Sequence, residues 1–180
     1  MNNNKVYINM NNPNDEIYTK LNDADQLVEY LVNNKIIDFN TKILLPFNDF
    51  VPGSDNITNS LGCHGFNNLY GSKIDFYELS KTFKNYDIII SNPPFSKRTK
   101  LFTRLMELDK PFILLQPIQA FNNNSFIKML CEKSDDFGFL CPKNRMVFIV
   151  NGVEKDKTTA FYSFWLCYKT KIKGWKSMEE

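Results

Sequence analysis

The stretch that decides the fold reads Tyr-Asp-Ile-Ile-Ile-Ser-Asn-Pro-Pro-Phe and occupies residues 86–95. Its three consecutive isoleucines predict a strand over residues 86–91 that is covered on both faces, as in a parallel sheet. The two prolines that follow lack backbone N–H groups, so the strand ends there and a rigid loop begins. Open α/β sheets bind ligands beyond the carboxyl ends of their strands, which makes this loop the first candidate for a site.

Helical and strand patterns alternate on both sides of this stretch. The expected helices, the first of them capped by Asn22 or Asp23, cover residues 17–33, 56–61, 75–82, 101–108 and 121–131. The other expected strands cover residues 42–47, 66–70, 111–117, 137–140, 146–150 and 160–169, with loops at 48–55 and 151–158. This order predicts an α/β fold with a mostly parallel sheet, helices on both faces and an antiparallel C-terminal hairpin. We expect a loose arm over residues 1–16, one domain over residues 17–173 and a tail over residues 174–180.

Composition limits the class of protein. The chain has 180 residues, of which 43% are hydrophobic, enough for the core of one domain. Its net charge of +2 does not by itself indicate a nucleic-acid partner. Four cysteines without paired spacing and a lone histidine, His64, predict neither a disulfide framework nor a metal site. No apolar run approaches a membrane span and no signal peptide is evident, so we expect a soluble protein in the cytoplasm, without a membrane partner.

The loop at residues 92–95 has the chemistry of an amino-group site. An aromatic amino nitrogen is a poor nucleophile because its lone pair is delocalised, and two hydrogen-bond acceptors favour the geometry in which the pair is localised. The Asn92 side-chain oxygen and the Pro93 carbonyl are such acceptors, while Pro93 and Pro94 stiffen the loop. Phe95 offers a face on which an extruded base can stack. The competing interpretation is a plain strand-terminating turn.

Two groups of basic residues allow two interpretations each. Lys97, Arg98, Lys100 and Arg104 follow the candidate loop and either bind phosphate or form the solvated face of a helix. A second group near the carboxyl terminus is interleaved with Tyr168 and Trp175, and we favour a solvated tail for it; its members are Lys169, Lys171, Lys173 and Lys176.

Around these residues the chain resembles the S-adenosylmethionine-dependent amino methyltransferases, and more closely small phage-type N6-adenine methyltransferase-like proteins. The resemblance is carried by Pro-Phe-Asn-Asp at residues 46–49, Asp-Phe-Tyr at 75–77 and the stretch at 86–96, with further likeness at 15–19, 108–115 and 161–168. It implies a Rossmann-like class I methyltransferase sheet and S-adenosylmethionine as cofactor.

The resemblance also implies roles for individual residues. The loop after the first strand of the sheet would face the methionine part of the cofactor, with Pro46, Phe47, Asn48, Asp49 and Gly53. Asp75 and Phe76 would lie near the cofactor's adenine. Asn92, Pro93, Pro94 and Phe95 would hold the target base.

Two departures from the family pattern keep several functions open. The cofactor loop has a single glycine, Gly53. The end of the second strand has no acidic residue for the ribose: Asn67, Asn68 and Tyr70 stand there, and the asparagines are weak substitutes. The first hypothesis is N6 methylation of adenine in DNA. The second is an inactive methyltransferase-like module that binds nucleic acid or a host defence protein, and the third is methylation of RNA adenine or protein glutamine. The expected partners are DNA, or alternatively RNA, with a homo-oligomer or a separate recognition subunit.

Overall fold

A central seven-stranded sheet organises the described part of the chain. The structure is a computed structural model, and it describes residues 17–47, 55–71, 76–79, 85–95, 98–150, 153–154 and 161–179. The order of strands in the sheet is β10-β6-β9-β5-β4-β2-β3. Their bounds are β2 Ile43–Leu44, β3 Leu69–Tyr70, β4 Ile88–Ser91, β5 Phe112–Pro117, β6 Phe137–Cys141, β9 Ser163–Tyr168 and β10 Gly174–Ser177.

Strand β9 alone runs against its neighbours in this sheet of the described residues. It pairs antiparallel with both β5 and β6, whereas the pairs β2·β3, β2·β4, β4·β5 and β10·β6 are parallel. The predicted α/β fold with a mostly parallel sheet and an antiparallel C-terminal element is therefore confirmed. The partner strands differ from the expected hairpin, because β7 (Phe148–Val150) joins β1 (Ile17–Thr19) and β8 (Val153–Glu154) in a separate small sheet.

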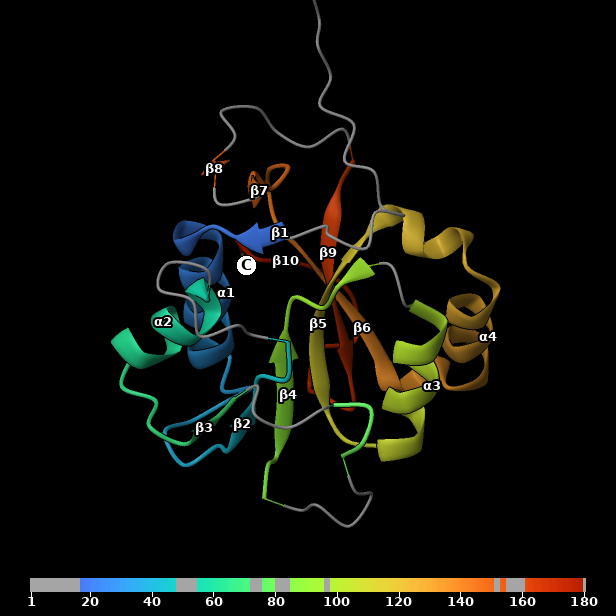
Figure 1. The fold of residues 1–180 in the computed structure, drawn as a ribbon, viewed down its shortest axis with the longest axis horizontal. Coiled ribbons are helices and arrows are strands. Elements are labelled where there is room, and N and C mark those ends of the chain that lie inside the picture. Colours follow the sequence, from blue (N-terminus) through green and yellow to red (C-terminus); the bar gives the residue numbers. More distant parts are fainter. Residues whose placement is uncertain are drawn as a thin grey trace, which may run out of the picture.

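Helices cover both faces of the sheet (Figure 1). On one face, α1 (Leu21–Asn33) and α2 (Asn56–Cys63) contribute to a buried cluster with Ile90, Leu115 and Trp165. On the other face, α3 (Arg98–Leu108) and α4 (Asn124–Glu132) contribute to a second cluster with Ile89, Leu114 and Leu166. Successive residues of each strand thus point into opposite clusters, as expected for a strand buried on both faces. The short 3-10 helices η2 (Ile118–Asn122) and η3 (Ser134–Asp136) flank α4.

Several predicted boundaries are corrected by the structure. Helix α1 starts at Leu21 with Lys20 as its N-cap residue and without a side-chain cap, so neither Asn22 nor Asp23 caps it; it ends at Asn33 as predicted. The strands predicted at 42–47 and 66–70 are only two residues long. The helix predicted at 75–82 is a turn at residues 76–78, and its remaining residues, apart from residue 79, lie outside the described part. The predicted arm at 1–16, and most of the loops at 48–55 and 151–158, also lie outside it.

The predicted solvated tail contains a strand. Strand β10 pairs in parallel with β6, with Trp175 opposite Phe139, and these two rings stack at 4.4 Å with an interplanar angle of 15°. Trp175 is nevertheless 58% exposed, because β10 is the edge strand. Lys171 donates to the backbone carbonyl of Lys35, and Lys173 donates to that of Asp135. These two members of the second basic group therefore make hydrogen bonds within the chain.

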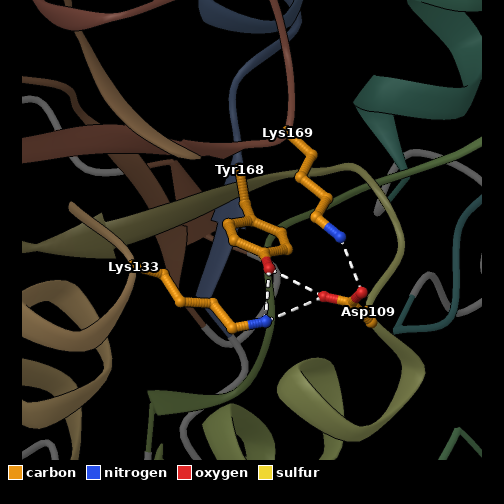
Figure 2. Close-up of polar contacts among 4 residues, drawn as sticks. All are labelled: Asp109, Lys133, Tyr168 and Lys169. Atoms are coloured by element: carbon orange, nitrogen blue, oxygen red, sulfur yellow. Dashed lines mark hydrogen bonds and ion pairs between the residues drawn. The ribbon is translucent and has the colours of Figure 1, made fainter. Parts of the chain in front are cut away.

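A polar cluster ties three elements together at the amino-terminal end of β5 (Figure 2). Asp109, in the turn between α3 and β5, accepts hydrogen bonds from Lys169 at 2.6 Å, Tyr168 at 2.8 Å and Lys133 at 3.0 Å. Lys133 is the C-cap residue of α4, Tyr168 is the last residue of β9, and Lys169 follows it. These hydrogen bonds hold the pKa of the Asp109 carboxyl well below its usual value.

Candidate active site

The candidate site lies where the order of the strands reverses. From β2 the chain crosses to β3 on one side and later returns to β4 on the other, and β2 and β4 are parallel neighbours with Leu44 opposite Ile89. The loops that follow these two strands therefore leave the same edge of the sheet side by side. This is the place where open α/β sheets bind ligands. Pro46 and Phe47 follow β2 and Asn92 follows β4, so both segments start from this edge of the sheet.

The loop after β4 combines a half-buried acceptor with buried neighbours. Asn92 is half-buried, Pro93 is buried and Pro94 is exposed. Strand β4 ends in Ser91, which is fully buried, so the loop starts from a fixed point. The half-buried Asn92 lies at the boundary between core and solvent.

Phe95 is not an open stacking face in this structure. Its side chain is 6% exposed and belongs to the buried cluster that includes Ile57 and Leu61 of α2. The Arg98 guanidinium carbon lies 6.0 Å from the ring centroid. Stacking of a base on Phe95 therefore requires that part of the ring be uncovered first.

The predicted cofactor residues that the structure describes come together. The Phe47 ring, after β2, meets the Phe76 ring, after β3, edge to face at 5.0 Å. Phe76 is 2% exposed and so supports the site from the core, while Phe47 and Tyr77 are half-buried and retain accessible surface. Asn48, Asp49, Gly53 and Asp75 lie outside the described residues.

Asp55 has a role that the sequence analysis missed. It is the N-cap of α2, and its Oδ1 accepts a hydrogen bond from the Thr58 amide at 3.1 Å. The next residue, Asn56, donates from its side chain to the Thr19 carbonyl at 2.8 Å. These contacts anchor the end of the loop that follows β2. An aspartate directly before a helix is a known capping signal, but here it was assigned to the loop.

The basic residues after the loop have different surroundings. Lys97 lies outside the described residues. Arg98 is half-buried, and burial lowers the pKa of its guanidinium. Lys100 is exposed, with its ammonium 4.2 Å from the centroid of the Tyr77 ring. The phosphate-binding or solvated role predicted for Arg104 does not fit the structure. Its side chain is only 11% exposed, and its guanidinium donates to the backbone carbonyls of Phe76 and Leu79.

The ribose-binding role predicted for the asparagines near β3 does not fit the structure either. Asn67 and Asn68 precede β3 rather than follow it. Their side chains donate to the carbonyls of Gly65, at 3.3 Å, and Phe39, at 3.4 Å. They therefore lie at the opposite edge of the sheet from the candidate site.

Neither a metal site nor a membrane span is present in the described part of the chain. There, no group of three histidine, cysteine or acidic residues is arranged to hold a metal ion. His64 Nδ1 lies 2.9 Å from the Ser60 carbonyl, a local contact at the end of α2. None of the described helices combines the length and the apolar character that a bilayer crossing requires.

Comparison with solved structures defines the class of fold. A putative class I S-adenosylmethionine-dependent methyltransferase from Listeria monocytogenes superposes with a TM-score of 0.53 at 12% identity, covering 89% of this chain and 66% of that one. A modification subunit of a putative type I restriction enzyme from Vibrio vulnificus gives 0.52 at 10% identity, covering 89% and 46%. The chain thus has a class I methyltransferase fold and spans one half to two thirds of these neighbours.

The family follows from the sequence of the same region. The model of the adenine-specific methyltransferase EcoRI family matches residues 68–165, more than half of the chain. The chain belongs to this family, which confirms the resemblance to adenine methyltransferases. A search of curated proteins gives no significant match.

Proposed function

We propose that this chain uses S-adenosylmethionine to methylate the N6 amino group of adenine in DNA. The observation that carries the proposal is the parallel pairing of β2 with β4, because the segment with Pro46 and Phe47 and the loop with Asn92 and Pro93 follow these two strands at one edge of the sheet. A methyl donor and an acceptor amino group must meet in line for direct transfer, and two adjacent loops at one sheet edge provide that arrangement. Membership in the adenine-specific family supports adenine as the acceptor.

The described residues fit the cofactor. When bound, S-adenosylmethionine supplies an electrophilic methyl group on a sulfonium. The half-buried rings of Phe47 and Tyr77, whose centroids are 6.3 Å apart, provide an aromatic surface suited to a flat adenine ring. We assign the methionine side of the site to Pro46, Asn48, Asp49 and Gly53, and the adenine side to Asp75, Phe76 and Tyr77. Phe47, whose ring meets those of Phe76 and Tyr77, borders both sides.

Asn92 and Pro93 orient the target amino group. The Asn92 side-chain oxygen and the Pro93 carbonyl each accept one amino hydrogen, which favours a pyramidal nitrogen with a localised lone pair. Neither proline of the loop has an N–H that would compete for these acceptors. Phe95 stacks with the base after its cover is displaced, and Pro94 keeps the loop rigid.

Lys97, Arg98 and Lys100 are the proposed contacts to the phosphates that flank the target base. Arg98 and Lys100 lie in the first turn of α3, where the helix N-terminus adds positive potential, and Lys97 precedes them in the sequence. Arg104 is withdrawn from this set because its guanidinium is held by backbone carbonyls. We further propose that a separate recognition subunit or a second copy of the chain contributes to reading DNA, and that the protein acts in the cytoplasm.

The test measures transfer of a radiolabelled methyl group to DNA. Asn92→Ala should lower the rate by roughly 100-fold, the loss typical when one preorganised polar contact to a reacting group is removed. Asn22→Ala, on the exposed surface of α1, is the matched control and should leave the rate unchanged. Calorimetry should show equal cofactor binding by both variants. Full activity of Asn92→Ala would refute the assigned role.

The same assay separates the alternatives. RNA and a glutamine-containing protein run in parallel with DNA identify the acceptor class, and methylation of either one in place of DNA would overturn the choice of substrate. The absence of cofactor binding by the wild-type chain would favour the non-catalytic module that binds nucleic acid or a host defence protein.

A further inference from the structure

One face of α3 is hydrogen-bonded to the segment that follows β3. The Arg104 Nε donates to the Phe76 carbonyl at 3.4 Å, and Nη2 donates to the Leu79 carbonyl. The third nitrogen, Nη1, pairs with Glu107 at 2.8 Å. All three guanidinium nitrogens are thus engaged within the chain, and the side chain is 11% exposed. A single guanidinium fixes two carbonyls that are three residues apart.

Lys100 adds a second contact from the same face of the helix. It lies four residues before Arg104, about one helical turn, so the two side chains project from one side of α3. Its ammonium is 4.2 Å from the Tyr77 ring centroid, a cation–π distance. Arg104 thus holds the backbone of residues 76–79, and Lys100 contacts Tyr77, the half-buried ring of this segment.

This segment borders the proposed cofactor site. It follows β3, whose last residue, Tyr70, lies opposite Leu44 of β2. The Phe76 ring packs into the cluster that also contains Leu44, and it touches Phe47 of the neighbouring loop. A shift of the segment would therefore change the position of the aromatic surface assigned to the cofactor's adenine.

Helix α3 also begins directly after the loop that contains Asn92 and Pro93. Its first turn is joined to the start of α4 by the Asn123 side chain, whose Nδ2 lies 3.5 Å from Thr99 Oγ1. The helix thus connects the proposed target-base loop at one end with the cofactor-side segment along its length. A rigid element that contacts two binding sites is a physical means of coupling them.

We propose that Arg104 is a positioning residue for the cofactor, and that through it α3 couples seating of the target-base loop to cofactor binding. The inference rests on the proposed use of S-adenosylmethionine. It differs from the phosphate-binding role that the sequence predicts for Arg104, because the guanidinium acts on backbone carbonyls within the chain. Coupling of this kind is reciprocal, so DNA bound at the loop should also tighten cofactor binding.

The experiment is calorimetric titration of S-adenosylmethionine into the full chain. Arg104→Ala should bind about tenfold more weakly, the lower end of the change seen when an orienting contact is lost. Arg104→Lys keeps the charge but not the planar fork, and should lose most of the same affinity. Glu107→Gln removes the ion pair and leaves both carbonyl contacts, so it is the matched control and should bind within twofold of the wild type.

Kinetics and DNA binding distinguish positioning from general destabilisation. For Arg104→Ala, the KM for the cofactor should rise while kcat at saturating cofactor stays near that of the wild type. DNA affinity without cofactor should be unchanged, together with its dependence on salt, whereas the tightening of DNA binding by saturating cofactor should be lost. Circular dichroism checks that each variant is folded, and Arg104→Lys decides the question if Arg104→Ala does not fold.

Three results would overturn the proposal. Cofactor affinity equal to the wild type in a folded Arg104→Lys or Arg104→Ala variant would exclude the positioning role. Weaker DNA binding with unchanged cofactor affinity would show instead that Arg104 binds DNA phosphate. A wild-type chain that does not bind the cofactor would refute the proposed function itself and this inference with it, a result that the variants alone cannot produce.

Discussion

Replacing Asp109 by asparagine should destabilise the fold without disturbing its backbone. Asp109 has a φ of 51°, in the left-handed region, where asparagine and aspartate are the best tolerated residues after glycine. Asp109→Asn therefore keeps the backbone conformation, while it removes the charge and replaces one acceptor oxygen with a donor nitrogen. The charge accepts hydrogen bonds from Lys133, Tyr168 and Lys169, which join the end of α4 and the end of β9 to the turn before β5 (Figure 2).

The size of the effect follows from exposure and geometry. The Asp109 side chain is 47% exposed, and the two lysines are 37% and 34% exposed, so each ion pair contributes at most about 1 kcal/mol. The short Tyr168 hydrogen bond to a charged acceptor adds a contribution of similar size. We expect Asp109→Asn to lower the free energy of unfolding by about 1–2 kcal/mol, or the Tm by roughly 3–6 °C in a chain of this length. Asp109→Ala should cost about 1 kcal/mol more because alanine is strained at this φ.

The dependence on pH identifies the source of the effect. Hydrogen bonds from Lys169, Lys133 and Tyr168 lower the pKa of the folded Asp109 carboxyl. The stabilisation is thus fully present above the unfolded pKa of about 4 and is lost as the pH falls through the folded value. The stability difference between the wild type and Asp109→Asn should be constant from about pH 8 to pH 5 and shrink below about pH 4.

The assay is thermal and urea denaturation of both chains across this pH range. Glu132→Gln, which breaks the exposed Lys128–Glu132 pair at 3.7 Å, is the control and should change stability by less than about 0.5 kcal/mol. If Asp109→Asn matches the wild type at pH 7, the cluster adds nothing to stability. If the difference persists unchanged at pH 3, the effect does not come from the carboxylate.

Two further substitutions test the packing around the sheet. Gly138→Ala should destabilise the fold by at least about 2 kcal/mol, because the added Cβ would lie 2.2 Å from the Ile172 carbonyl oxygen. Gly62→Ala, whose Cβ would have no atom within 4 Å, should be neutral or slightly stabilising. Urea denaturation of both variants measures this contrast, and equal effects would contradict it. Gln116→Leu should stabilise by about 1 kcal/mol, because this fully buried amide has no hydrogen-bond partner for either of its polar atoms in the described structure, and a lower Tm for the variant would show that the amide is satisfied in solution.

Local patterns in the sequence were sufficient for the elements that determine their own structure. The strand at 86–91, the loop after it and the helix that follows were all predicted, because consecutive isoleucines, paired prolines and helical periodicity act over a few residues. Strands β2 and β3 were overestimated, since their length depends on how far the two strands remain paired across the sheet. Strand β10 was missed because its four residues, Gly-Trp-Lys-Ser, contain no apolar run or alternation, and only its pairing with β6 makes it a strand.

The candidate site shows the same division. Asn92 and Pro93 could be predicted because their chemistry lies in consecutive residues at a strand end. The role of Arg104 could not, because the carbonyls it holds are 28 and 25 residues away in sequence, and a basic residue after a candidate DNA-binding loop fits phosphate equally well. The burial of Phe95 was also hidden, because it depends on packing with residues of α2, which lie far from Phe95 in the sequence.

The two residues that sequence patterns misjudged suggest how the site is controlled. Phe95 shares its buried cluster with Ile57 and Leu61 of α2, the helix that follows the β2 loop and is capped by Asp55. Arg104, on the other face of the sheet, holds the segment after β3 from α3. The loop proposed to hold the target base is therefore linked to the proposed cofactor side through α2 on one face of the sheet and through α3 on the other. Because interfaces of packed helices shift between discrete arrangements rather than deforming continuously, occupation of the cofactor side should bias how far Phe95 is uncovered.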